Sequence, residues 1–129
     1  MTTVQPEGWP QPRGYSNGMI AHGRVLAVAG QIGWNERGEF ASDDFAEQSA
    51  QALRNVLAVV AAAGGSATNV IRLTWYVTDK REYLAAASEL GVTYRELFGS
   101  HYPAMTLVQV AALLEDRAKV EIEATAVLA

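Results

Sequence analysis

The stretch His101–Val127, HYPAMTLVQVAALLEDRAKVEIEATAV, decides the fold. Over residues 106–110, every second residue is β-branched, and over residues 120–126 small or aliphatic residues alternate with polar ones. A period of two predicts β-strands. The second strand has one aliphatic face and one face that carries Glu121 and Glu123. The carboxylate face is either exposed to solvent, which is the commoner case for a charged strand face, or part of a functional site.

Upstream of this stretch, the N-terminal third of the chain predicts an arm and a hairpin. Residues 1–14 contain three of the four prolines and predict an extended arm with little regular structure. Residues 19–32 predict a β-hairpin that turns at His22-Gly23-Arg24. Near its end, Gly30 has no side chain, so a ligand or another chain could approach the backbone there, although a glycine in a strand is equally typical of a bulge.

The middle of the chain predicts two helices with a strand between them. Residues 42–63 have helical periodicity, with Asp44 at the predicted N-cap and Glu47 three residues later. Residues 70–78 alternate as a strand, and residues 79–99 predict a second helix. The element order is therefore ββ-α-β-α-ββ. We expect an α+β, two-layer sandwich in which two helices cover one face of a mixed sheet and partner subunits cover the other.

Composition limits the classes of protein that this chain can represent. The length of 129 residues predicts one domain, 1–129, with an apolar fraction of 50% that suits a compact core. A net charge of −4, with eight scattered arginines and two lysines, argues against nucleic acid as a partner. The chain contains no cysteine and no apolar run near the roughly 18 residues that cross a bilayer, and because the first 14 residues have no apolar h-region we expect an untargeted protein. We expect a cytoplasmic protein with no membrane partner.

The inventory of reactive side chains excludes several mechanisms. His22 and His101 are the only histidines, so a Cys-His pair is impossible and neither a catalytic triad nor a metal site is indicated. No glycine-rich phosphate loop is present, and we expect no cofactor. The remaining candidates for acid–base chemistry are a carboxylate and a tyrosine, namely Glu121 and Tyr15.

Several short segments resemble the Rid (reactive intermediate deaminase, YjgF-like) family. The C-terminal signature is carried by Pro103-Ala104-Met105, the valine-rich strand after it and Glu121–Ala124. The other matching segments, in the same order and spacing, are Gly14-Tyr15-Ser16, Ala29-Gly30-Gln31-Ile32, the helix that ends at Gly64, and Val77-Thr78-Asp79. The resemblance implies a chorismate-mutase-like fold and a homotrimer whose three sites lie in clefts between subunits.

The resemblance also implies a chemistry. In active members an arginine clamps the carboxylate of a 2-imino acid, and a glutamate, helped by a tyrosine and backbone groups, positions the water that releases ammonia. Glu121 and Tyr15 match the glutamate and the tyrosine. Met105 stands in place of the arginine, Ala29 in place of a serine and Gly91 in place of an asparagine. Loss of the bidentate guanidinium contact should cost roughly 1.5–3 kcal/mol of affinity or more, so ordinary 2-imino acid deamination is not expected.

These exchanges indicate a roomier and more apolar cleft, suited to an uncharged or aromatic small-molecule ligand. The predicted ligand-binding residues are Gly30, Gln31, Trp34, Gly91, Tyr102, Met105 and Thr106. Two hypotheses remain. The first is a Rid-type hydrolase of an imine, enamine or related C=N compound, with Glu121 activating water. The second is a non-catalytic small-molecule binding or interaction protein on the same trimeric scaffold.

Overall fold

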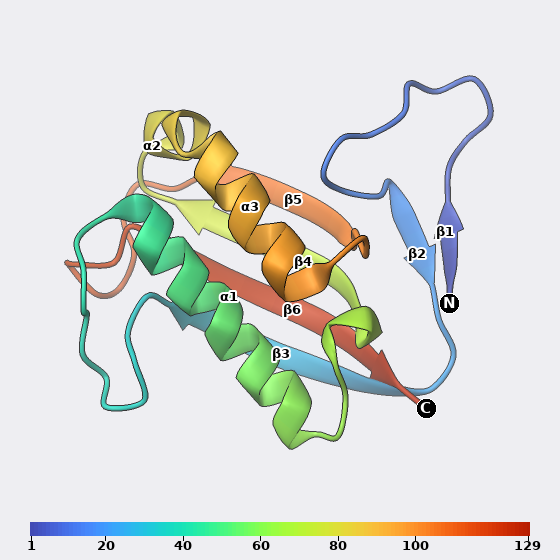
Figure 1. Cartoon of the computed structure of the whole chain (residues 1–129), viewed down its shortest axis with the longest axis horizontal. Helices are drawn as coiled ribbons and strands as arrows, with labels where there is room; N and C mark the ends of the chain where they lie inside the picture. Colours follow the sequence, from blue (N-terminus) through green and yellow to red (C-terminus); the bar gives the residue numbers. More distant parts are fainter.

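A computed structural model describes residues 1–129 and has a four-stranded mixed sheet as its centre. The strands of this sheet are β3 (Arg24–Ile32), β4 (Val70–Val77), β5 (Ala104–Gln109) and β6 (Val120–Leu128). Their order is β3-β6-β4-β5, and the β4–β5 pair is parallel whereas the other two pairs are antiparallel. Figure 1 shows the helices on one side of this sheet. The predicted α+β architecture with a mixed sheet is confirmed.

Two long helices form the second layer. Helix α1 (Phe45–Ala62) begins after Asp44, whose side chain accepts a hydrogen bond from the Glu47 backbone N–H at 3.0 Å, as the sequence predicts. Helix α3 (Ala87–Phe98) ends at Gly99, which has a φ of 64°. A short 3-10 helix, η1 (Ala67–Asn69), precedes β4. Figure 1 shows α1 and α3 crossing the same face of the sheet.

The second predicted helix is divided. Residues 79–99 were expected to form one helix, but α2 (Lys80–Ala85) and α3 meet at Ala86, whose ψ of 6° departs from the helical value. Ala86 is buried against the core. No glycine or proline marks the break in the sequence. The small Ala86 side chain packs where the helix changes direction, and local periodicity does not reveal that change.

The predicted hairpin over residues 19–32 is wrong. Strand β2 (Gly18–Ile20) pairs with β1 (Thr2–Val4) in a separate two-stranded ribbon, while β3 pairs with β6. The arm therefore contains a strand that the sequence does not predict. Gly23, at a φ of 144°, passes so close to the end of β6 that a Cβ atom there would lie 2.9 Å from the Leu128 carbonyl carbon. The segment between β2 and β3 therefore passes the end of β6 and does not form a tight hairpin turn between β2 and β3.

The hydrophobic core fills the space between the helices and the sheet. Alternation along β6 divides its side chains: Val120, Ile122 and Ala124 are buried under the helices, whereas Glu121 and Glu123 lie on the opposite, partly exposed face. The fully buried aliphatic residues that meet β6 include Leu53, Val56 and Val60 of α1 and Val70, Leu73 and Val77 of β4. Burial of these side chains is the main stabilising contribution to the fold.

One buried amide joins the two layers. Gln48 of α1 is 1% exposed, and its Nε2 donates to the carbonyl oxygens of Ser42 and Arg117, both at 3.0 Å. Its Oε1 accepts from the Lys119 backbone N–H at 2.9 Å. All three partners would be unsatisfied without it. Gln48 therefore fixes the start of α1 against the loop that leads into β6.

We predict that Gln48→Ala lowers the free energy of unfolding by about 2–4 kcal/mol, because each buried polar group left without a partner costs about 1–3 kcal/mol. Urea denaturation measures the loss. The control is Gln51→Ala, which removes side-chain hydrogen bonds made within the same helix and should cost less than about 1 kcal/mol. Equal losses in the two variants would show that Gln48 is not the joint described here.

Candidate functional site

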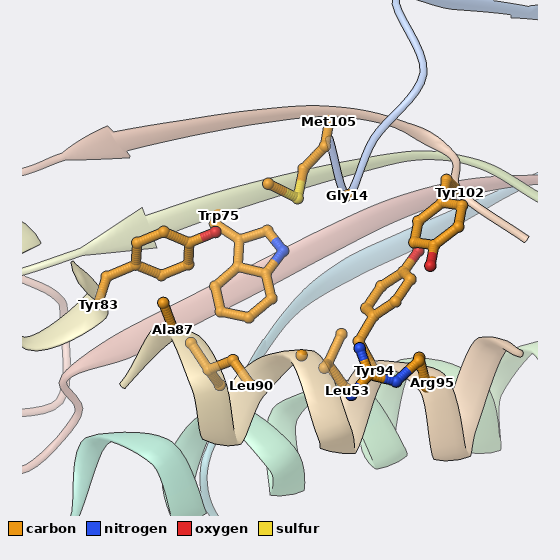
Figure 2. A pocket seen from close by; sticks show the side chains of 11 residues that line it. Gly14, Leu53, Trp75, Tyr83, Ala87, Leu90, Tyr94, Arg95, Tyr102 and Met105 are labelled. Atoms are coloured by element: carbon orange, nitrogen blue, oxygen red, sulfur yellow. The ribbon is translucent and has the colours of Figure 1, made fainter. Parts of the chain in front are cut away.

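A pocket of about 280 Å³ lies between α3 and the sheet. Its lining is mostly apolar and contains no carboxylate: Gly14, Leu53, Trp75, Tyr83, Ala87, Leu90, Gly91, Tyr94, Arg95, Tyr102 and Met105. Figure 2 shows α3 below these side chains and Met105 above them. We call this space the α3 pocket. An apolar hollow with a few polar groups is the usual form of a small-molecule site.

Aromatic rings build both ends of the α3 pocket. At one end Tyr83 packs edge-on against Trp75, with ring centroids 5.7 Å apart. At the other end Tyr94 stacks on Tyr102, with centroids 5.7 Å apart and planes 14° from parallel. Tyr94 reaches this position because residues 87, 90, 91 and 94 share the face of α3 that looks toward the sheet.

The environment keeps two of these tyrosines neutral. Burial raises the pKa of Tyr83, and burial followed by repulsion from Tyr102 raises the pKa of Tyr94. The Tyr94 hydroxyl also donates to the His101 carbonyl oxygen at 3.2 Å. Neither phenol is ionised near neutral pH. The α3 pocket therefore offers a ligand apolar surface and hydrogen-bond donors but no carboxylate base.

A second group of candidate residues lies on the opposite face of the sheet. There the Tyr76 hydroxyl donates to Glu123 Oε1 at 2.5 Å. Glu121 accepts no hydrogen bond from the rest of the chain, and its carboxylate lies against Gly30. A Cβ atom at Gly30 would be 2.7 Å from Glu121 Cδ, so glycine is needed at that position for the carboxylate to lie there. Glu121 is thus the carboxylate of this face that remains free to act on another molecule.

The hydrogen bond to Glu123 also affects the ionisation of Tyr76. It is the largest cause of a pKa above the ordinary 10.0, followed by burial and by repulsion from the carboxylates of Glu123 and Glu121. Since the folded-state pKa is raised, the stabilising contribution of neutral Tyr76 is complete below about pH 10 and is lost as the pH rises through the raised value.

Strand alternation separates the predicted site residues into two sets. In the β4–β5 register, Met105 is paired with Leu73 and faces the helices, whereas Thr106 is paired with Thr74 and faces away. Gly91, Tyr102 and Met105 therefore meet in the α3 pocket, while Gly30, Thr106 and Glu121 are on the other face. Met105 and Glu121 are not brought together within one chain.

Tyr15 stands at the edge of the sheet beside the α3 pocket. It follows Gly14, which lines the pocket, and it is 37% exposed. The next residue, Ser16, fixes this segment to the start of β5, because its backbone N–H donates to the Pro103 carbonyl at 3.1 Å and its hydroxyl donates to the Tyr102 carbonyl at 2.6 Å. Tyr15 is thus held near the pocket mouth by its neighbours.

The two other predicted residues lie outside the α3 pocket. Trp34 packs on Phe40, with ring centroids 6.0 Å apart, and the backbones of the two residues form a β-bridge. Trp34 therefore closes the loop between β3 and α1. The Gln31 side chain bonds to the Ala29 carbonyl at 3.0 Å, across the irregularity in the β3–β6 register.

Sequence reasoning missed several residues of the α3 pocket. Tyr83, Leu90 and Tyr94 fall on a helical stripe that predicts core packing, and Trp75 falls on the apolar face of a strand. The signal that could have found them is Gly91, a position without a side chain inside that stripe, with Arg95 one helical turn later.

No three side chains of His, Cys, Asp or Glu gather as a metal site would require. None of the helices combines the length and apolar character needed to cross a bilayer.

Comparisons with known proteins show the family to which the chain belongs. A family model described as endoribonuclease L-PSP matches residues 10–128. The crystal structure of YyfB from Yersinia pestis, a Rid family protein of unknown function, superposes with a TM-score of 0.85 at 32% identity and covers 98% of each chain. The chain belongs to the Rid family.

Relatives of this Rid protein include named enzymes. A 2-iminobutanoate/2-iminopropanoate deaminase of Escherichia coli is 34% identical over 129 residues, which cover 97% of this chain and 96% of that protein. A RutC family protein of Pyrococcus horikoshii is 36% identical over 121 residues, or 93% of this chain and 92% of that protein. Family membership and the imine deaminases among its relatives support a Rid-type function in general terms.

We predict that Glu123→Gln lowers the pKa of Tyr76 toward 10.0, because a neutral amide no longer disfavours the phenolate. Absorbance at 295 nm during an alkaline titration measures the change, and Tyr76→Phe assigns the signal. Glu121→Gln, which removes only a weaker repulsion, should shift the pKa less. An unchanged titration in Glu123→Gln would contradict the assignment.

Proposed function

We propose that this Rid protein is a cytoplasmic hydrolase of an imine, enamine or related C=N small molecule, acting at a site shared between subunits. The observation that carries the proposal is the state of Glu121, whose partly buried carboxylate rests on Gly30 with no partner in the chain. The neighbouring Glu123 is occupied by Tyr76. A free, positioned carboxylate in the place of the family's glutamate is what water activation requires.

In the proposed reaction Glu121 accepts a proton from water while the water oxygen bonds to the carbon of C=N. Glu121 returns this proton to nitrogen, giving a neutral tetrahedral carbinolamine. The carbinolamine hydroxyl proton is then transferred to nitrogen as the C–N bond breaks, which releases ammonia and leaves a carbonyl compound. One water is consumed for each ammonia formed. Tyr15, near the mouth of the α3 pocket, is the proposed group that orients the reacting molecule.

The separation of Glu121 from the α3 pocket supports a shared site. The pocket has no carboxylate of its own, so a ligand held there needs Glu121 from a second copy of the chain. The face that carries Glu121 also belongs to a sheet with large apolar side chains in contact with solvent, including Val25 at 72% and Val108 at 41% exposure. Such a surface suits packing between subunits, and we propose a homotrimer.

Position 105 limits the substrate. A thioether cannot reproduce the planar donor fork of a guanidinium, so imines of small amino acids are proposed to be poor substrates. Gly91 and Met105 stand where the resemblance implies an asparagine and an arginine, so the α3 pocket favours a larger, more apolar molecule. A non-catalytic binding protein on the same scaffold is the alternative, and the behaviour of Glu121 separates it from the hydrolase.

We predict that native mass spectrometry at micromolar concentration detects a species of three times the 13.9 kDa chain mass. The physical reason is that assembly would bury the exposed apolar side chains and would bring Glu121 of one copy to the α3 pocket of another. A stable monomer would contradict both the trimer and the shared site.

We predict that Glu121→Gln reduces turnover by at least about 100-fold, the usual contribution of a general base, while the oligomer and its melting temperature stay unchanged. Imines are generated from a panel of amino acids with an amino-acid oxidase, and semicarbazide trapping measures the imine that remains. Glu123→Gln is the matched control and should retain turnover within about threefold. Retained turnover in Glu121→Gln would favour the binding protein instead.

A further inference from the structure

We infer that the α3 pocket binds an organic acid with an aromatic or large aliphatic side chain, such that Arg95 receives the acid group and Trp75 Nε1 donates a hydrogen bond inside the pocket. Applied to the hydrolase, this makes 2-imino acids with bulky side chains the substrate class. That extension rests on the proposed function, whereas the binding itself does not.

Trp75 supplies a donor that the chain does not use. The residue is 3% exposed, and its Nε1 has no hydrogen-bond partner. Buried indole N–H groups are normally paired, because leaving one unpaired is unfavourable. Figure 2 shows this nitrogen directed away from Tyr83 and toward the end of the pocket where Tyr94 and Tyr102 stand. An acceptor atom on a ligand would satisfy it.

Met105 is the side chain placed to admit such a ligand. It lines the pocket from β5, opposite α3, and is only partly buried. Methionine has three rotatable side-chain bonds, so it can change rotamer with little strain. Movement of the thioether would widen the pocket from the β5 side without disturbing the sheet.

Arg95 supplies the charge that position 105 lacks. It lies one turn after Gly91 on α3, and its Nη1 is 3.7 Å from the point where a Gly91 Cβ atom would stand. The two ion pairs of the structure, Arg117–Asp43 and Lys119–Glu82, do not include it, and its guanidinium makes no hydrogen bond. The absent side chain at Gly91 therefore leaves an unpaired guanidinium bordering the pocket, where its donor fork suits a carboxylate.

The exposure of Arg95 determines which acids bind. An ion pair on an exposed arginine adds little affinity by itself, so a small acid gains almost nothing from it. The aromatic walls of the pocket provide the larger part of the binding free energy, because burying a phenyl or branched aliphatic group increases affinity by about 10- to 100-fold. The pocket of about 280 Å³ is at the small end of ligand sites and suits a single ring with a short acidic chain.

Isothermal titration calorimetry with three probes tests the inference. Phenylpyruvate carries the ring and the acid group, its methyl ester carries the ring without the charge, and pyruvate carries the charge without the ring. We expect phenylpyruvate to bind at least about tenfold more tightly than pyruvate and about three- to tenfold more tightly than the ester. Equal affinity for phenylpyruvate and pyruvate would overturn the inference.

Variants assign the contacts. Arg95→Gln should weaken phenylpyruvate binding to the level of the ester and leave ester binding unchanged, whereas Arg81→Gln, an exposed arginine on α2 outside the pocket, should change neither. Trp75→Phe removes the N–H and should weaken both ring compounds. Because that residue belongs to the core, Gly91→Leu provides a second test, since leucine favours the helix and fills the gap. It should abolish phenylpyruvate binding without lowering the melting temperature.

The outcomes separate this inference from the proposed function. If the probes and variants follow the expected pattern but no imine is hydrolysed, the pocket assignment stands and the hydrolase proposal fails. If Arg95→Gln and Arg81→Gln bind phenylpyruvate alike, or if Gly91→Leu binds it as tightly as the unmodified chain, the assignment of the acid group to Arg95 or of the ligand to the α3 pocket is wrong, whatever the turnover.

Discussion

The hydrogen bonding of β6 to strands on both sides is the constraint on which the rest of the molecule depends. Pairing with β3 and β4 makes β6 an interior strand, so its aliphatic face must be covered. Helices α1 and α3 provide the cover (Figure 1), and Gln48 holds α1 to the loop before β6. The same alternation that buries Ile122 necessarily turns Glu121 and Glu123 outward.

This alternation also explains why the candidate chemistry is divided. An aromatic pocket without a carboxylate lies on the helical side of the sheet, and a carboxylate without an intrachain partner lies on the other. A sheet cannot place both on one side unless the strand register shifts by one residue, which would expose the core. The proposed site would be completed only by assembly of several copies of the chain.

The α3 pocket combines an apolar strand residue with a cation from the helix. Met105 offers an apolar, movable side chain where the resemblance to the Rid signature implies an arginine. The gap at Gly91 lets the side chain of Arg95 approach from the helix instead. Both changes leave the backbone of α3 and β5 regular, so a different ligand chemistry would require no new scaffold.

Local sequence determined the elements but not all of their partners. The period-two pattern around Ile122, the cap at Asp44 and the overall α+β class follow from interactions between near neighbours, and the family signature marked Glu121. Tertiary structure alone decided that β2 pairs with β1, that the second helix breaks at Ala86 and that Met105 and Glu121 face opposite ways. It also placed Trp75 and Arg95 in the lining of one pocket. These features depend on contacts between residues distant in sequence, whose free energies no local pattern contains.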